Sequence, residues 1–246
     1  MRTALHAEWT KLRTSPGTAW LLLGVVAATI GLSAAAAAAV SCGTEGSAGC
    51  AADLTKVSLT GVQLGQALVA ILAVLVIGNE YSTGMVRVSL AAVPRRTRML
   101  AAKVLVTAAA TGAAALAGVA GSLLAGRLLL PAHEFLWRPA IGSVLYLELI
   151  ALLSLGLATA VRSPAAAAGI VLGLLYAWPI VARVVTDETW SRHLQQIGPM
   201  SAGTAVQATK NLATLPIGPW AGLGVLALWA LGGLLAGWLL LVGRDA

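Results

Sequence analysis

One acidic side chain stands deep inside a long apolar run, where a carboxylate is costly to place. Glu148 is surrounded by mostly aliphatic residues between Ala140 and Val161. If this run crosses a membrane, the acid indicates a functional site by default, because its charge is disfavoured in hydrocarbon. It would then bind a cationic group of a substrate or relay a proton. The alternative, which we favour, is a structural carboxylate that is neutral or paired with Arg183.

Two glutamines form a second polar feature inside an apolar run. Gln63 and Gln66 lie about one helical turn apart. Amide side chains in a membrane helix either line a polar pathway or hydrogen-bond to neighbouring helices. The residues themselves leave both interpretations open.

The motifs of common catalytic and metal sites are missing from the sequence. A phosphate-binding P-loop needs a lysine directly after a glycine, and none of the lysines follows one. The histidines form neither an HExxH motif nor an i, i+4 pair, and there is no CxxC motif. We therefore expect no catalytic residue, no metal and no bound cofactor in this chain, so it is not expected to be an enzyme.

The two cysteines flank a short segment rich in glycine and serine, SCGTEGSAGC. Cys42 and Cys50 would be free to form a disulfide if this segment faces an oxidising exterior. Spacing alone does not establish the geometry of the bond. A disulfide and two free thiols therefore remain equal alternatives.

The composition indicates that most of the chain lies in a membrane. Hydrophobic residues make up 59% of it and charged residues 10%, whereas a soluble domain has about 25% charged residues. The net charge of +7 would suit nucleic acid in a soluble protein. In membrane proteins, however, Lys and Arg gather in cytoplasmic loops. We expect contact with the lipid bilayer and none with nucleic acid.

Several apolar runs are long enough to cross a bilayer, which takes roughly 20 helical residues. They are residues 18–40, 57–78, 104–126, 140–161, 165–185 and 220–242. Their apolar residues are continuous rather than alternating, which favours helices over a barrel. The prediction is an all-α polytopic membrane protein with six transmembrane helices, in which residues 1–246 form a single transmembrane domain.

Small residues and one proline are expected to shape these helices. The GxxxG spacings at Gly61–Gly65, Gly169–Gly173 and Gly233–Gly237 allow helices to approach closely. Pro179 is expected to kink the fifth span. Only three residues separate the fourth and fifth spans, which predicts a tight helical hairpin.

The distribution of basic residues predicts that both termini are cytoplasmic. With the N-terminus inside, the inner segments hold Arg2, Lys11, Arg13, Arg87, Arg95, Arg96, Arg98, Lys103, Arg162 and Arg244. The outer segments hold fewer, namely Lys56, Arg127, Arg138, Arg183, Arg192 and Lys210. Lys and Arg concentrate in cytoplasmic loops, so this orientation is favoured.

The first ten or so residues are expected to form an interfacial helix. Leu5, Trp9 and Leu12 occur at i, i+4 and i+7, so they share one face of a helix. Such a helix lies in the plane of the lipid headgroups, with Trp9 at the interface and the basic residues towards anionic lipid. A role in coupling and a role as a plain basic anchor are equal alternatives.

The loop from 79 to 103 is expected to lie outside the hydrocarbon. Its second half holds three arginines within four positions, and each would cost roughly 2.5–3.5 kcal/mol at mid-membrane. Ser82 or Thr83 is suited to cap a short helix, and Pro94 is suited to end it. A short apolar helix with a basic exit suits the groove of a partner protein. A lipid-facing basic loop is the alternative of equal weight.

Three stretches resemble the permeases of bacterial type-two ABC exporters. AEWTKLRTSPGTAWLLL resembles the elbow helix that leads into their first span. GNEYSTGMVRVSLAAVPRRTRMLAAK resembles their first cytoplasmic loop, which carries the coupling helix that docks on the nucleotide-binding subunit. The C-terminal LLLVGRDA resembles the end of their last span. The resemblance covers essentially the whole chain.

The resemblance implies a permease subunit of an ATP-driven exporter in the bacterial cell membrane. A separate ATPase subunit would bind ATP and magnesium, and a second permease copy or homologue would complete the pathway. The residues at or just after the ATPase contact would be Glu80, Tyr81, Thr83, Gly84, Arg87, Arg95 and Arg96. The second and fifth spans would line the route, which favours the lining role of Gln63 and Gln66. The cysteine-bearing segment does not match the family pattern.

Two other functions compete with this one. A non-transporting membrane protein, such as an immunity or sensor subunit, would have the same spans without a substrate pathway. A proton-coupled secondary transporter would depend on Glu148 and need no ATPase. The transported substrate is not readable from the residues.

Overall fold

The structure is a computed structural model that describes residues 2–40, 53–92, 95–130 and 136–243. Every regular element within these ranges is helical, and no strand occurs in them. Six helical segments are long and apolar enough to cross a membrane. The predicted all-α fold with six membrane helices is therefore confirmed.

The first three spans follow a short N-terminal helix. α1 (Arg2–Thr14) precedes the first span, α2 (Pro16–Ala39). The second span consists of α3 (Leu54–Ser58) and α4 (Val62–Ser82), and α5 (Met85–Ala92) follows it. The third span is α6 (Arg96–Leu129).

The last three spans include one broken helix. The fourth is α7 (Trp137–Val161), and the fifth runs through α8 (Pro164–Leu172), the π-helix η2 (Gly173–Ala177) and α9 (Trp178–Val184). Short helices follow, namely α10 (Glu188–Ile197), α11 (Pro199–Gly203), η3 (Thr204–Gln207) and η4 (Leu212–Thr214). The sixth span is α12 (Pro219–Gly243).

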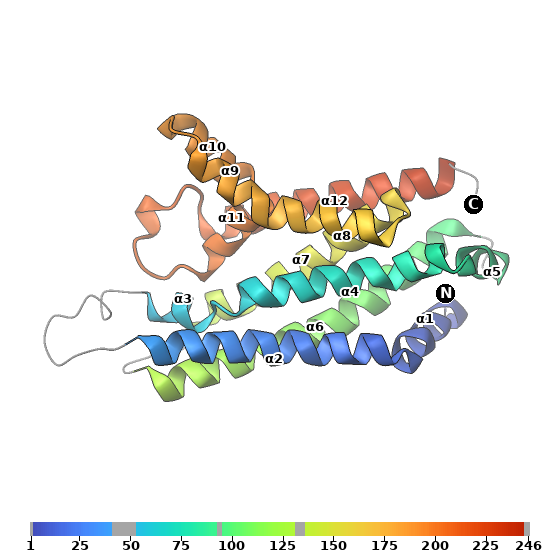
Figure 1. The fold of residues 1–246 in the computed structure, drawn as a ribbon, viewed down its shortest axis with the longest axis horizontal. Coiled ribbons are helices and arrows are strands. Elements are labelled where there is room, and N and C mark those ends of the chain that lie inside the picture. The colour runs from blue at the N-terminus through green and yellow to red at the C-terminus, as the bar shows by residue number, and fades with distance from the viewer. Residues whose placement is uncertain (1, 41–52, 93–94, 131–135, 244–246) are drawn as a thin grey trace, which may run out of the picture.

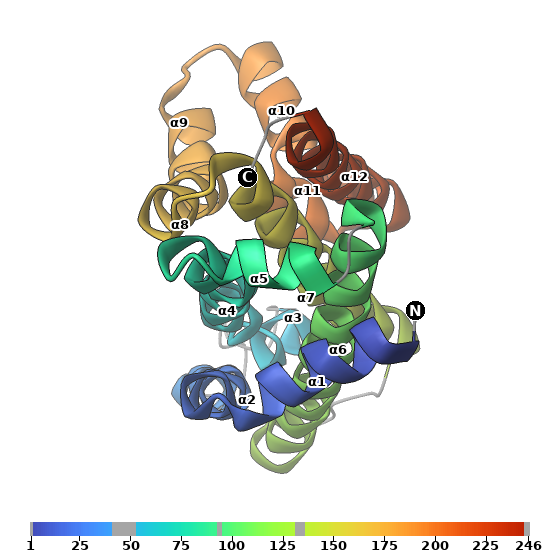
Figure 2. The same ribbon diagram turned by 90° about the vertical axis from the view of Figure 1, so that its right-hand side faces the viewer.

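The spans run side by side along the long axis, and α7 lies among them (Figure 1). It packs against α4, α6, α8 and α12, and it contributes the fully buried Tyr146, Leu147 and Ile150 to the core. α1 and α5 lie across one end of the bundle, which faces the viewer in Figure 2. This end also receives the C-terminal end of α12 (Figure 1).

Two arginines attach the C-terminal end of α12 to the neighbouring helices at this end of the bundle. Arg96, in the first turn of α6, donates to the carbonyl of Leu241 at 2.8 Å. Arg162, between α7 and α8, donates to the carbonyl of Leu240 at 3.2 Å. Cations at a helix C-terminus satisfy its last carbonyls and complement the helix dipole.

The third span starts earlier than its hydropathy indicates. α6 begins at Arg96 rather than near residue 104, so Lys103 lies within a helix and not in a loop. Its side chain is only 1% exposed. Hydropathy marks the part of a helix that hydrocarbon surrounds, and α6 continues past that part as regular helix.

Two of the three GxxxG pairs form close helix contacts. A Cβ atom on Gly61 would lie 1.9 Å from the carbonyl oxygen of Thr29 in α2. A Cβ atom on Gly237 would lie 2.6 Å from the carbonyl oxygen of Gly156 in α7. Gly169 and Gly173 have no atom within 4 Å of such a position. The first and third pairs therefore pack the bundle itself.

The hairpin and the irregular fifth span agree with the sequence. Arg162 adopts φ 61° at the turn, and the Ser163 side chain accepts from the amide of Ala166 to cap α8. The π-helix η2 ends just before Pro179. Proline has no amide hydrogen and clashes with the preceding turn, and a π-bulge accommodates such a break.

Candidate functional site

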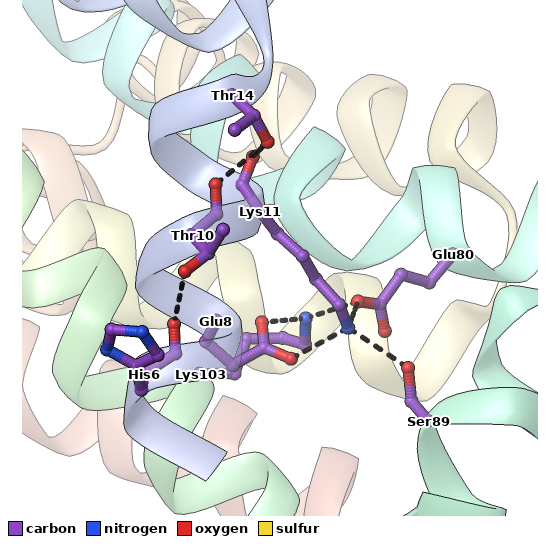
Figure 3. A network of polar contacts seen from close by, with 8 residues as sticks. All are labelled: His6, Glu8, Thr10, Lys11, Thr14, Glu80, Ser89 and Lys103. Carbon is purple, nitrogen blue, oxygen red and sulfur yellow. Dashed lines mark hydrogen bonds and ion pairs between the residues drawn. The ribbon is translucent and has the colours of Figure 1, made fainter. Parts of the chain in front are cut away.

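Charged side chains from three helices meet at the end of the molecule that carries α1 and α5. Glu8 and Lys11 come from α1, Glu80 from the last turn of α4, and Lys103 from α6. Ser89 reaches them from α5 (Figure 3). We refer to these five residues as the ion cluster.

Each lysine of the ion cluster bridges both carboxylates. The Lys103 ammonium lies 2.7 Å from Glu8 Oε2 and 2.9 Å from Glu80 Oε1. The Lys11 ammonium lies 3.0 Å from Glu8 Oε1 and 2.9 Å from Glu80 Oε1. It also donates to Ser89 Oγ at 3.0 Å. Through Lys11, the cluster therefore connects α5 to α1 and α4.

Both carboxylates of the cluster are buried, and their charges are balanced by the two lysines. Glu8 is 8% exposed and Glu80 6%, and two carboxylates face two ammonium groups. Burial acts to raise the Glu8 pKa, but Lys103 and Lys11 outweigh it and hold that pKa below its ordinary value. Burial likewise acts to lower the Lys11 pKa, and Glu80 and Glu8 raise it above its ordinary value. Both groups are therefore held in their charged forms.

α1 turns a polar face towards the bundle. Ala4 and Glu8 are its buried residues, and Lys11 follows at helical spacing, so the three lie on the face that packs against α6. Trp9 is 47% exposed, and its position at the membrane interface stays a prediction. The expectation that the basic residues of this helix face lipid is wrong for Lys11, because two carboxylates bind it.

The end of α4 is also held on its other side. The Tyr81 hydroxyl donates to the carbonyl of Thr159 in α7 at 3.5 Å. The Arg162 guanidinium lies 5.8 Å from the centre of the Tyr81 ring, within the range of a cation–π contact. The consecutive residues Glu80 and Tyr81 thus attach α4 to opposite parts of the bundle.

The link between α4 and α5 is a sharp turn. Thr83 ends α4 and donates from its hydroxyl to the carbonyl of Asn79 at 2.6 Å. Gly84 has φ +71° and no atom within 4 Å of a Cβ position, so glycine suits this backbone conformation. The helix predicted after these residues is confirmed as α5.

The three arginines predicted for coupling are spread over this end of the molecule. Arg87 lies on α5, and its side chain is outside the described part of the structure. Arg95 is the exposed N-cap residue of α6. Arg96 binds the end of α12. Of the two arginines whose side chains the structure describes, neither has an ion pair with Glu80.

The two glutamines of α4 have different surroundings. Gln66 is fully buried; it accepts from the Tyr146 hydroxyl and donates to the sulfur of Met200 at 3.3 Å. Gln63 is exposed, and its backbone carbonyl accepts from the Tyr176 hydroxyl. Gln66 thus has the interhelical bonds of the structural interpretation, while a lining role for Gln63 stays a prediction.

Glu148 lies away from the ion cluster, at the contact of α6 with α7. The Thr111 hydroxyl donates to Glu148 Oε1 at 3.4 Å. A Cβ atom on Gly112 would lie 2.3 Å from the same oxygen, so glycine leaves room for the carboxylate. Among the described residues, no ion pair joins Glu148 to Arg183. Cys42 and Cys50 fall outside the described ranges.

Sequence reasoning missed most of the ion cluster. Lys11 and Lys103 were counted only as charges that orient the spans, and Glu8 and Ser89 received no role. One signal was available, because Glu8 and Lys11 at i, i+3 pair on a helix surface. The distance from Lys103 to either acid depends on tertiary packing and leaves no local pattern.

The chain is similar to a known family of transporter proteins. The sequence profile of a family described as "ABC-2 family transporter protein" matches residues 4–180. The matched part includes all the residues of the ion cluster and the turn that precedes α5. A comparison with curated proteins found no match.

Proposed function

This chain belongs to the ABC-2 family of transporter proteins, and from that premise we propose that it is the permease of an exporter moved by a separate ATPase. As a member of this family, it is a multi-pass membrane permease of an ABC transporter. The proposal adds that α5 receives the ATPase and that the ion cluster passes its motion to the spans. ATP and magnesium belong to the ATPase, and this chain catalyses no reaction.

The surface of α5 supports a docking role. Met85 is 46% exposed and Val88 66%. Both residues lie on a short helix at the end of the bundle (Figure 2), outside the segments that span the membrane. Exposed apolar residues on a short helix suit the groove of a partner protein.

The contacts beneath α5 carry the proposal. Ser89 of α5 bonds to Lys11, and Lys11 pairs with Glu80 at the end of the second span. A shift of α5 thereby acts on the elbow helix and on α4 together. Coupled motion requires such an element with discrete contacts on both sides.

Orientation and assembly follow from the same proposal. The end with α1 and α5 faces the bacterial cytoplasm, in line with the excess of Lys and Arg in the segments there. A second permease copy or a homologue completes the pathway. Substrate leaves the cell as the two permeases alternate between inward- and outward-facing states.

A charged substitution on α5 tests whether the ATPase docks on this helix. The Val88→Glu variant is expected to lose at least about tenfold of its co-purifying ATPase, because a carboxylate would be desolvated in an apolar groove. The tagged permease is isolated from its own host, and the bound chain with a Gly-Lys-Ser/Thr phosphate-binding loop is quantified.

The matched control changes an exposed apolar residue at the other end of the molecule. Leu212 of η4 is 41% exposed, and Leu212→Glu is expected to retain the ATPase fully. Equal ATPase recovery in the Val88 variant and the wild type would contradict docking on α5.

A further inference from the structure

A cavity of about 300 Å³ lies beside the ion cluster. One part of its wall is apolar and comes from α2, α4 and α6, with Leu21, Leu72, Leu75, Val76 and Val106. The other part is polar and consists of Glu8, Lys11, Glu80, Lys103 and Thr107. Gly17, Asn79 and Thr83 also line the cavity and are exposed, so it opens to the surroundings of the bundle end.

Two residues that line the cavity each have a buried polar atom without a hydrogen-bond partner among the described residues. Glu80 Oε2 and Thr107 Oγ1 have none within the described part of the chain. Glu80 is 6% exposed and Thr107 is fully buried. In Figure 3, the second carboxylate oxygen of Glu80 carries no contact, while the first accepts from Lys11. Leaving such atoms unpaired is unfavourable and calls for a partner.

We propose that this cavity binds the head of an amphiphile that carries a primary ammonium group. The ammonium donates to Glu80 Oε2, since the lysines of the ion cluster already serve Glu80 Oε1 and both oxygens of Glu8. Thr107 supplies a hydroxyl to the same head. A carboxylate forms its strongest hydrogen bonds with charged donors.

The apolar wall of the cavity indicates that the part of the ligand beyond the head is a hydrocarbon chain. Leu72, Leu75 and Val76 follow one side of α4, and Val106 faces them from α6. They contact the first methylene groups beyond the head. A volume of about 300 Å³ is at the lower limit of ligand cavities, so it holds a headgroup and a short length of chain rather than a whole diacyl lipid.

Two sources supply this chemistry. One is phosphatidylethanolamine of the leaflet that surrounds this end of the bundle, and the other is a free long-chain amine. This inference does not rest on the proposed coupling to an ATPase, because binding concerns the permease alone.

Binding is measured on the purified permease in detergent by titration and native mass spectrometry. The probes are dihexanoyl phosphatidylethanolamine and octylammonium. Their controls are dihexanoyl phosphatidylcholine and octyltrimethylammonium, which keep the charges and chains but have no N–H donor. At least one primary ammonium probe is expected to bind about tenfold tighter than its control. Phosphatidylethanolamine alone would indicate the lipid source, and octylammonium alone the free amine.

Removal of the unpaired hydroxyl tests the site without changing the ion cluster. Thr107→Val is expected to weaken binding by about 3- to 10-fold, the usual effect of one lost hydrogen bond. Thr111→Val makes the same change one turn further along α6, outside the cavity, and is expected to leave binding unchanged.

A second variant blocks the cavity itself. A Cβ atom at Gly17 or at Gly31 meets no atom within 4 Å, but only Gly17 lines the cavity. Gly17→Phe is expected to abolish binding and Gly31→Phe to preserve it. Equal affinity for the probes and their N–H-free controls, or unchanged binding in both the Thr107 and Gly17 variants, would overturn the inference and leave the cavity to water.

Discussion

The two ends of the second span are anchored by carboxylates in different ways. At the α5 end, Glu80 accepts from two ammonium groups inside a buried cluster. At the other end, Asp53 caps α3 by accepting from the amide of Lys56 at 3.1 Å. It also accepts from the Thr209 hydroxyl at 2.6 Å and from the amide of Lys210 at 3.0 Å. One end is held by ions and the other by neutral donors.

This difference predicts how each end responds to change. Removing one buried ion leaves its partners charged and unpaired, which is strongly destabilising. The donors to Asp53 can bond to water instead, because Thr209 is only half-buried and Lys210 is exposed. The ion cluster at the α5 end is therefore expected to form or break as a unit. The hydrogen bonds to Asp53 at the other end are expected to be lost one at a time, each at a small cost in stability.

Loss of the buried lysine is expected to have the largest effect. Lys103→Met leaves Glu8 and Glu80 to share Lys11, and a broken buried ion pair costs about 3–5 kcal/mol. A fall in the thermal unfolding temperature of the detergent-solubilised protein would measure it. Lys11→Met should cost less, since that side chain is 37% exposed and water can replace part of its contribution.

A double variant separates charge balance from packing. Adding Glu8→Gln to Lys103→Met leaves one acid and one lysine, Glu80 and Lys11, at 2.9 Å. This variant is expected to be more stable than Lys103→Met alone. If the added change lowers stability further by its full single-variant effect, then the cluster does not act as a unit.

Loss of the Asp53 carboxylate is expected to have an intermediate effect. Asp53→Ala removes a helix N-cap, which contributes about 0.5–2 kcal/mol, together with the bonds to Thr209 and Lys210. Asp187→Ala is the matched control, because Asp187 caps α10 through Trp190 at 3.0 Å. The thermal unfolding temperature of each variant is measured. The difference between the two decreases in temperature gives the contribution of the bonds from Asp53 to Thr209 and Lys210. Equal effects of the two substitutions would show that the link adds nothing.

Lowering the pH is expected to have the smallest effect of these changes on the unfolding temperature. The effect comes from the protonation of Glu8 in the ion cluster. Lysines hold the Glu8 pKa below its ordinary value of 4.5. A lowered folded-state pKa stabilises the protein above the unfolded pKa, and this stabilisation is lost as pH falls through the folded value. The unfolding temperature of the wild type should therefore approach that of Glu8→Gln below about pH 4.5. A constant difference between pH 7 and pH 3 would contradict the pairing of Glu8.

Much of the fold follows from local sequence properties. Apolar runs of bilayer length predicted the six spans, and Pro179 predicted a break in the fifth span, where η2 lies. Local patterns also predicted the short helix α5, but its expected caps Ser82 and Thr83 donate instead to the carbonyl of Asn79 at the end of α4. These features depend on a few neighbouring residues, so the sequence displays them directly.

The ion cluster could not be predicted in the same way. Glu8, Glu80 and Lys103 are far apart in the sequence, and hydropathy placed Lys103 in a loop. Their meeting depends on α6 continuing as a helix beyond the hydrocarbon and on the rotation of α1 about its axis. Neither has a local signal, since a lysine near the end of a span is equally consistent with a solvated charge that only sets orientation.

The most direct measurement places a photo-crosslinking amino acid at Val88 of α5 in living cells. We expect a crosslink to the ATPase chain from position 88 that changes in yield when ATP is depleted, and none from the same amino acid at position 212. A crosslink from Leu212, or labelling at position 88 of a Val88→Cys variant by a membrane-impermeant maleimide added outside the cells, would contradict docking of the ATPase on α5.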